Sequence, residues 1–474
     1  MLKKRIFLSL AAVCFASYSA RADTTVSQDA VKSLNVTVYN NGLGLVKDSR
    51  SVDLKKGENI LSFQGVSAQI QPETALFEGN GLKVREQNFN FDLLSRESLL
   101  RKFLGKDIQV IETHYISGKK TIENAKVLSV DAGLVLKIGD RIETDYNGRL
   151  IFPDIPADLY DQPTLTINVA ADNDGRRDVE LSYLTNGLSW RADYVAELND
   201  AEDALNLNGW VTLTNTSGIA YNDANIQFVA GSVNRVRPPA APRPMMLKAR
   251  NMAAMDSVAL GAAMTEEELM DYHLYSLGRK TDIASNQTKQ LALLSAFGVK
   301  VKKEYKFTNI VPVYRGRSSS GEFDLRNAEV VLQFDNDKAS NLGLSLPGGI
   351  IRVYKADSKQ NMFFVGEDKI NHIPENGKVK LDLGNAFDVT VQGKETAYTA
   401  FSDKAYEAGY TLNFKNAKET PVKITYLQDF SNQWTITDSS VPYTTPTTRR
   451  AEWTITVPPK GQTVLNYTVR VQRP

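Results

Sequence analysis

The chain has 474 residues, of which 56 are basic and 55 acidic, and its formal net charge at pH 7 is +1. A nucleic-acid-binding protein needs basic residues concentrated on one face, whereas here both signs alternate along the chain, as in Lys302-Lys-Glu304. The composition therefore argues against nucleic acid as a partner. The length predicts about three domains.

The first 22 residues have the pattern of a secretory signal peptide. Lys3-Lys-Arg5 precedes an uncharged run over residues 6–20, and Ala20-Arg-Ala22 supplies the small residues of a cleavage site. Cleavage after Ala22 predicts export to a Gram-negative periplasm, with secretion as the alternative. The single cysteine, Cys14, lies in this stretch, so the processed chain is expected to have no thiol chemistry and no disulfide. No later apolar run approaches the roughly 20 residues of a membrane-spanning helix.

Residues 23–105 predict an N-terminal β region with one short helix. Strand-like runs between residues 34 and 63 are separated by turn sequences such as Asn41-Gly42 and Lys56-Gly57. These dipeptides favour hairpins because glycine adopts positive φ at low cost. Leucine and phenylalanine then recur at helical spacing from Leu93 to Leu104, and Gly105 is expected to end that helix.

Residues 106–156 predict a small SH3-like β-barrel. Five short strand-like runs are expected at 107–115, 121–130, 133–138, 141–144 and 149–152. Each break carries glycine, aspartate or asparagine, and strands of this length with tight turns are typical of small barrels. Pro153 and Pro156 mark the boundary, because proline cannot donate a hydrogen bond to a β-ladder.

The rest of the chain predicts a β-sandwich that is interrupted once. Residues 164–236 are expected to form its first part and residues 281–474 its remaining strands, since longer alternating runs recur at regular spacing. Residues 237–280 form a Pro/Met-rich insertion, in which Thr265-Glu-Glu-Glu268 predicts a capped helix through Tyr275. The predicted fold class is therefore mainly β and multi-domain, with a short helical or disordered insertion.

Candidate catalytic and metal-binding residues are few. The three histidines are His114 in a predicted strand, His273 in the predicted helix and His372 in a loop, and no two have metal-ligand spacing, which argues against catalytic zinc. Asp172-Asn-Asp-Gly175 is expected to be a β-turn, because an EF-hand register would place apolar residues at ligand positions. Gly231-Ser-Val-Asn234 lacks the second glycine of a hydrolase elbow. No catalytic, cofactor-binding or metal residue is assigned, and no cofactor is expected.

The tryptophan and methionine residues are expected to serve packing or contact rather than sugar or metal binding. The four tryptophans lie within or beside alternating strands and are expected in the core rather than on a sugar-binding platform; they are Trp190, Trp210, Trp434 and Trp453. The segment Trp190-Arg191-Ala-Asp193-Tyr194 is expected to be scaffold, in which the arginine beside aromatic residues makes a fixed ion pair or stack. A methionine cluster in the insertion could bind Cu(I), but an adaptable contact surface is preferred; it comprises Met245, Met246, Met252 and Met255.

Three segments resemble a known family. They are Leu181-Ser-Tyr-Leu-Thr-Asn-Gly-Leu-Ser-Trp-Arg-Ala-Asp-Tyr194, Leu207-Asn-Gly-Trp-Val-Thr-Leu-Thr-Asn-Thr-Ser-Gly218 and residues 224–231. They resemble a β-rich domain of unknown function found in bacterial secreted proteins and related to the C-terminal part of mucoidy inhibitor A. The resemblance runs from about Thr164 to Pro474 and implies a β fold without implying an activity. The mucoidy inhibitor members carry an N-terminal coiled coil, whereas this chain shows no sustained heptads there.

The leading functional hypothesis is a non-enzymatic envelope protein that acts as a binding or structural module. Its expected partner is an envelope protein or polymer, and the insertion 237–280 is the expected contact, because polyproline-prone chain and methionine suit partner capture. Two alternatives remain open. One is a carbohydrate-active or other hydrolase whose carboxylates converge only in three dimensions, and the other is Cu(I) binding by the methionines.

Overall fold

The computed structural model describes residues 22–90, 92–113, 118–131, 133–144, 146, 148–156, 158–231, 233–234, 264–270, 272–312 and 322–472. These residues are mainly β, which confirms the predicted fold class. The predicted signal peptide up to residue 21, His114 and the four clustered methionines lie outside the described residues. No helix in the described part of the chain is long and apolar enough to cross a membrane.

The chain divides into two compact units. Unit 1 comprises Met1–Ser189, Thr214–Gln227 and Arg279–Gln287, and unit 2 comprises Trp190–Leu213, Phe228–Gly278 and Thr288–Pro474. The predicted first part of the sandwich, residues 164–236, therefore contributes to both units. Short 3-10 helices occur at Gln28–Ala30, Pro72–Thr74 and Lys338–Ser340.

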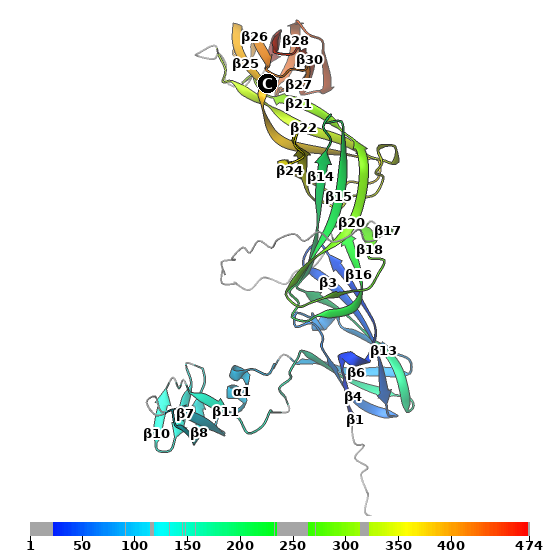
Figure 1. The fold of residues 1–474 in the computed structure, drawn as a ribbon, viewed down its shortest axis with the longest axis vertical. Helices are drawn as coiled ribbons and strands as arrows, with labels where there is room; N and C mark the ends of the chain where they lie inside the picture. The colour runs from blue at the N-terminus through cyan, green and yellow to red at the C-terminus, as the bar shows by residue number, and fades with distance from the viewer. Residues whose placement is uncertain are drawn as a thin grey trace, which may run out of the picture. The chain divides into compact units, whose positions relative to one another are not determined.

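The strands of the N-terminal region are divided between two sheets of unit 1 (Figure 1). One has the order β1-β4-β12-β6, formed by β1 (Ala22–Val26), β4 (Gly57–Gln64), β12 (Thr164–Ala171) and β6 (Leu82–Asn90). The other contains β16 (Tyr221–Ala230), β2 (Val31–Tyr39), β3 (Leu43–Leu54), β13 (Gly175–Asn186) and β5 (Leu76–Gly79), with β19 (Thr281–Ile283) paired to β16. Asp172-Asn-Asp-Gly175 connects β12 to β13 through a bend over residues 172–174.

A helix and five short strands of unit 1 surround a core of their own. The helix α1 (Arg96–Lys102) is capped by Ser95, whose hydroxyl accepts a hydrogen bond from the Ser98 amide, and Gly105 beyond it has φ of +77°. The strands β7 (Asp107–Thr113), β8 (Lys120–Ser129), β9 (Val135–Ile138), β10 (Arg141–Thr144) and β11 (Arg149–Ile151) form one antiparallel sheet in the order β10-β9-β8-β7-β11. The predicted helix and all five predicted strands are confirmed.

Unit 2 contains a sheet in the order β20-β15-β14-β23-β24. Its strands are β20 (Gln287–Lys300), β15 (Ala204–Asn215), β14 (Leu188–Leu198), β23 (Gly349–Ala356) and β24 (Met362–Ile370). Strands β14 and β23 pair in parallel, with Ala192 opposite Gly349. A side chain at Gly349 would collide with the Ala192 carbonyl, so the close approach of these strands requires glycine.

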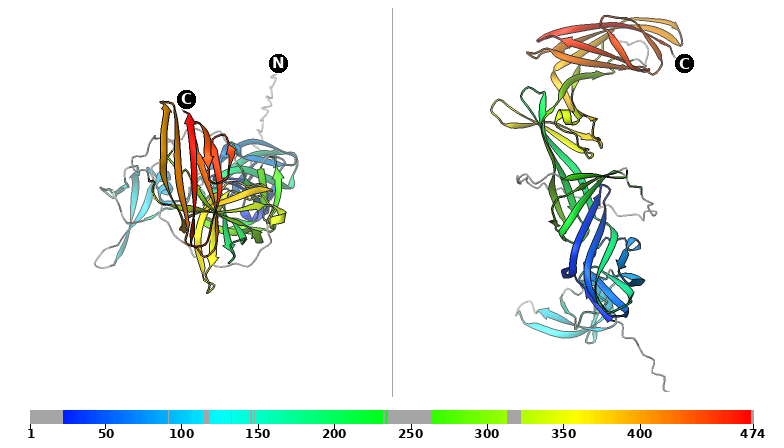
Figure 2. Two further views of the ribbon diagram at one scale, coloured as in Figure 1. Left: turned by 90° about the horizontal axis from the view of Figure 1, so that it is seen from above. Right: turned by 90° about the vertical axis from the view of Figure 1, so that its right-hand side faces the viewer.

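A nine-stranded sheet completes unit 2, and its strands, coloured yellow-green to red, lie side by side in Figure 2. In their order across the sheet the strands are β28 (Gln433–Ser439), β31 (Gly461–Gln472), β26 (Ala405–Asn416), β25 (Gly377–Ser402), β22 (Arg326–Asn336), β21 (Lys302–Thr308), β27 (Val422–Asp429), β30 (Arg450–Val457) and β29 (Tyr443–Thr447). The rings of Trp453 on β30 and Tyr467 on β31 are 4.9 Å apart although these strands are not neighbours in the sheet. The sheet therefore folds over its own aromatic core.

The prediction of a helix from Thr265 to Tyr275 is wrong. The segment forms an antiparallel hairpin of β17 (Thr265–Leu269) and β18 (Tyr272–Ser276), with Met270 in the turn at φ of 55°. The Tyr275 ring is buried and lies 6.4 Å from the ring of Trp190. Packing of the aromatic residues of β18 overrides the local capping pattern, since tyrosine favours strands.

Candidate functional site

One end of the nine-stranded sheet holds an open pocket of about 680 Å³, here called the terminal pocket. Gln472, the last residue of β31, pairs with both Ala405 on β26 and Gln433 on β28, so three strand ends meet there. The turn between β25 and β26, the loop between β27 and β28 and the turn between β29 and β30 complete the rim. The lining residues are Lys404, Ser431, Asn432, Gln433, Thr448, Arg449 and Gln472.

The charged residues that line the terminal pocket are all positive. Its two charged side chains, Lys404 and Arg449, are both exposed, and neither forms an ion pair with any described residue. Amides and hydroxyls make up the rest, and no carboxylate occurs among the lining residues that the structure describes. Arginine, lysine and amide groups are hydrogen-bond donors. The pocket therefore presents donors and positive charge together.

The turn that carries Arg449 is held in place by hydrogen bonds from two aromatic residues. The Trp434 indole N–H donates to the Thr448 carbonyl at 3.0 Å, and the Phe430 amide donates to the Arg449 carbonyl at 2.7 Å. The rings of Phe430 and Trp434 stack with centroids 4.6 Å apart and an interplanar angle of 22°. Because aromatic residues fix the backbone of this turn, the cationic side chain projects from a rigid base.

A second polar cluster of unit 2 surrounds Asp193 on β14. Of the ion pair or stack predicted for Arg191, the structure shows an ion pair with Asp193, at 2.9 Å from Nε to Oδ2. Arg352 on β23 adds a second ion pair at 3.1 Å, and the Thr212 hydroxyl donates to Oδ2 at 2.7 Å. Burial opposes ionisation of this carboxyl, but the hydrogen bonds from Thr212 and Arg352 and the charge of Arg191 lower the pKa of Asp193. With its acceptors occupied, Asp193 ties three strands together.

The lowered pKa of Asp193 predicts a pH-dependent contribution to stability. A carboxyl whose pKa is lower in the folded state stabilises fully above its unfolded pKa of about 3.9 and loses that contribution as the pH falls through its folded pKa. We expect Asp193→Asn to be less stable than wild type at about pH 6 and the difference to narrow below about pH 4. Urea unfolding followed by tryptophan fluorescence measures it, because all four tryptophans lie in unit 2. A constant difference across this range would contradict the assignment.

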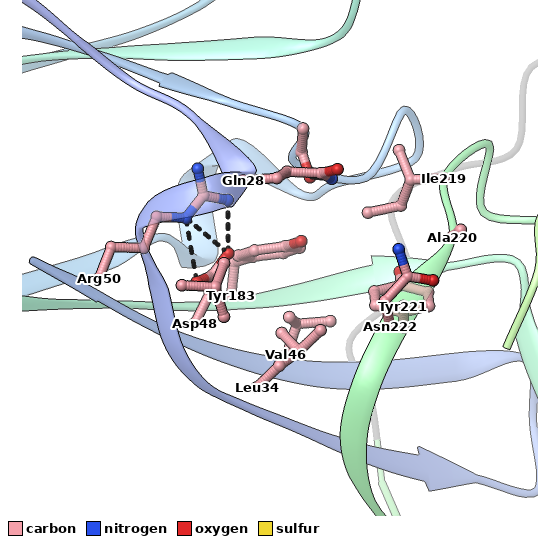
Figure 3. A pocket seen from close by; sticks show the side chains of 12 residues that line it. Gln28, Leu34, Val46, Asp48, Arg50, Tyr183, Ile219, Ala220, Tyr221 and Asn222 are labelled. Carbon is pink, nitrogen blue, oxygen red and sulfur yellow. Dashed lines mark hydrogen bonds and ion pairs between the residues drawn. The ribbon is translucent and has the colours of Figure 1, made fainter. Parts of the chain in front are cut away.

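A buried ion pair lines a small cavity of unit 1, shown in Figure 3. The Arg50 side chain on β3 is fully buried, and its Nη2 lies 2.6 Å from Oδ2 of Asp48. Nη1 donates to the carbonyls of Val26 and Gln64 at 2.8 and 2.9 Å, and the guanidinium lies 4.0 Å from the centre of the Phe63 ring. The cavity volume is about 80 Å³, below the roughly 300 Å³ at which small-molecule pockets begin. The arginine therefore fastens β1, β3 and β4 rather than offering free donors to a ligand.

One of the two described histidines occupies a different setting from the one predicted. His273 lies on β18, not on a helix, and its Nδ1 is 2.7 Å from Oε1 of Glu266. His372 lies in a loop, as predicted, and its Nδ1 accepts a hydrogen bond from the Gly348 amide at 3.1 Å. Burial, followed by the charge of His273, lowers the pKa of His372. No cluster of three histidine, cysteine or carboxylate side chains suited to a metal ion occurs in the described ranges.

The tryptophans follow the predicted packing to different degrees. Trp190 and Trp453 are buried in the core, Trp434 is partly buried against it, and Trp210 is half-buried on β15. The Trp190 indole N–H donates to the Val229 carbonyl at 3.3 Å. The structure places none of the four at the rim of the terminal pocket, although Trp434 supports one side of that rim.

The model of one protein family matches most of the chain. The family is described as a domain of unknown function, DUF4139, and its model matches residues 179–474. The chain belongs to the DUF4139 family. The match confirms the resemblance to a β-rich domain of unknown function, which was expected from about Thr164. No curated protein matches the chain. The DUF4139 match covers all of the residues that line the terminal pocket.

Proposed function

We propose that this DUF4139 protein is an exported binding module of the bacterial cell envelope that holds an anionic polymer in its terminal pocket without turning it over. The observation that carries the proposal is the composition of the pocket lining: Lys404 and Arg449 are its only charged residues among those described, and the others carry amide or hydroxyl groups. Export rests on the predicted cleavage after Ala22. The polymer partner follows from the openness of the site, since the pocket is bounded by turns and strand ends rather than enclosed.

The energetic argument depends on two unengaged cations. Hydrogen bonds to charged groups contribute about 1.5–3 kcal/mol each, and a lysine or arginine already paired with a carboxylate would have to give up that pairing to bind a ligand. Lys404 and Arg449 have no such described partner, so a carboxylate or phosphate gains the interaction without displacing one. Repeated charges along a polymer then multiply a modest single contact through high local concentration.

The test measures binding of the purified processed chain to polymers of different charge. We expect slower migration in native gels that contain polygalacturonate or polyphosphate, and unchanged migration in gels that contain neutral dextran. Lys404→Gln with Arg449→Gln is expected to weaken polyanion binding at least tenfold, because about 1.4 kcal/mol corresponds to a factor of ten. Added salt should weaken binding by the wild type.

A matched control separates the pocket from general electrostatics. Lys415→Gln with Lys423→Gln makes the same charge change at exposed positions on β26 and β27 of the same sheet, outside the pocket. Equal weakening by both double variants, or dextran binding as strong as polyanion binding, would overturn the proposed site. Release of new reducing ends from polygalacturonate by the wild type, lost in the pocket variant, would overturn the absence of turnover.

A further inference from the structure

A second pocket of the nine-stranded sheet arises where the pairing of two strands is interrupted. On β22, Asn327 pairs with Thr390 of β25, but Glu329 pairs with Asn385, so the intervening part of β25 bulges out of the ladder. The Asn327 side-chain amide donates to the Ala386 carbonyl at 2.7 Å and holds the bulge. The pocket beside it has a volume of about 360 Å³ and is here called the bulge pocket. Bulges often mark sites where a sheet has been adapted for binding.

Two cations of the bulge pocket are available to a ligand. Lys306 on β21 is half-buried, and it forms no ion pair with any residue in the described ranges. Burial and then the charge of Lys380 lower the pKa of Lys306, while the charge of Glu329 opposes this shift. Arg326 at the start of β22 adds a guanidinium whose Nη1 donates a long hydrogen bond of 3.5 Å to the Asn309 carbonyl. Arg450 lies nearby but is held by Asp429.

One polar atom of a residue that lines the bulge pocket has no hydrogen-bond partner among the described residues. Thr308 lines the same pocket, and its buried Oγ1 atom has no hydrogen-bond partner in the described part of the chain. A buried hydroxyl without a partner costs about 1–3 kcal/mol, so a ligand oxygen that accepts its proton would recover that cost. The amide of Asn385 lies at the edge of the bulge and can donate as well. Donors from three strands therefore face one cavity.

One carboxylate restricts which anion fits. Glu329 on β22 pairs across the ladder with Lys306, yet the two side chains form no ion pair. A bare multiply charged anion would meet the repulsion of this carboxylate. A ligand that carries hydroxyl groups beside its negative charge would instead donate a hydrogen bond to it. The volume lies at the lower end of small-molecule pockets, which begin at about 300 Å³.

We infer that the bulge pocket binds a small hydroxylated oxyanion, a sugar acid or a sugar phosphate, with its carboxylate or phosphate on Lys306 and Arg326 and a hydroxyl on Glu329. The site is separate in residues from the terminal pocket and does not depend on it. The acidic group fixes one end of the ligand, the Thr308 hydroxyl contacts it from below, and the Glu329 carboxylate selects for hydroxyl groups at the other end.

The experiment is calorimetric titration of the full processed chain carrying Lys404→Gln and Arg449→Gln, which removes the terminal pocket from the measurement. The probes are glucuronate, glycerol 3-phosphate, glucose, acetate and inorganic phosphate. Binding of glucuronate or glycerol 3-phosphate, with glucose at least tenfold weaker, is the expected result. The stronger of the two acids identifies the source as carboxylate or phosphate. Glucose binding as tight as that of both acids, or no binding by either acid, would overturn the inference.

Variants of the pocket assign the roles. Lys306→Met is expected to weaken the bound acid at least tenfold, whereas Lys415→Met on the exposed face of β26 should leave it unchanged. Glu329→Gln should narrow the preference for the hydroxylated acids over acetate and phosphate. Unchanged affinity in Lys306→Met, or an unchanged preference in Glu329→Gln, contradicts the assigned contacts. Thr308→Val, nearly equal in shape, provides a further variant if the lysine substitution prevents folding.

Discussion

Replacing Arg50 with methionine is expected to lower the free energy of unfolding of unit 1 by about 3–5 kcal/mol, because removing one partner of a buried ion pair leaves the other charge uncompensated. Asp48 would keep its carboxylate in a site where it is only 5 % exposed. The carbonyls of Val26 and Gln64 would lose their donor at the same time. The unfolding transition followed by far-UV circular dichroism measures this, because unit 1 contains no tryptophan.

Two further variants distinguish an unpaired charge from the loss of any arginine. Arg101→Met removes an exposed arginine that pairs with Glu97 across one turn of α1, and such surface pairs contribute little. The double variant Asp48→Leu with Arg50→Met removes both charges and should recover most of the lost stability, since well-packed apolar pairs can replace buried ion pairs. A double variant as unstable as Arg50→Met would show that the carbonyl contacts, not the charge, decide the outcome.

Replacing Trp453 with alanine is expected to destabilise unit 2 by about 3–5 kcal/mol, the usual cost of removing a large buried aromatic side chain. The Trp453 ring is fully buried and stacks on Tyr426 with centroids 5.1 Å apart, and Tyr443 and Tyr467 also lie against it. Its N–H also donates to the Ser439 hydroxyl at 3.1 Å. Urea unfolding followed by the fluorescence of the three remaining tryptophans gives the change.

The matched control for this cavity is an aromatic residue of the same sheet that packs against little. Phe387 in the bulge of β25 is 89 % exposed, and its replacement with alanine should change the unfolding free energy by less than about 0.5 kcal/mol. Comparable losses from the two substitutions would mean that the aromatic cluster around Trp453 does not carry the stability of the sheet.

Local turn chemistry made part of the fold predictable. In the small five-stranded sheet, Gly118 and Gly139 take φ of +65° and +58°, so the glycines that marked the strand ends are the residues that the turns require. Two errors elsewhere have a non-local cause. The pattern at Thr265 satisfies a helix cap but yields to packing of Tyr275 near Trp190. Within the predicted sandwich strands of residues 281–474, the alternating runs 378–383 and 389–392 suggest two separate strands, whereas β25 continues through both with register shifts.

The candidate sites were harder to predict from the sequence than the fold was. A fixed contact of Arg191 could be predicted because aromatic residues lie beside it in the sequence, but its partner Asp193 could not. Lys404 and Arg449 lie 45 positions apart and meet only where strand ends converge, and neither sits in a recognisable motif. Lys306 and Asn385 are likewise joined only by a register shift that depends on which strands pair. Pairing partners in a sheet of this size are set by the whole chain.

The strand at which the family match begins has a practical meaning for anyone who expresses the DUF4139 region alone. The match starts at residue 179, inside β13, yet β13 is hydrogen-bonded on one side to β3 and on the other to β5, and both precede residue 179. A fragment cut at that point would retain eight of the twelve residues of β13 without either neighbouring strand, and the two unpaired edges would favour intermolecular association. Conservation of sequence and autonomy of folding thus have different limits in this chain, and useful fragments should begin before β2.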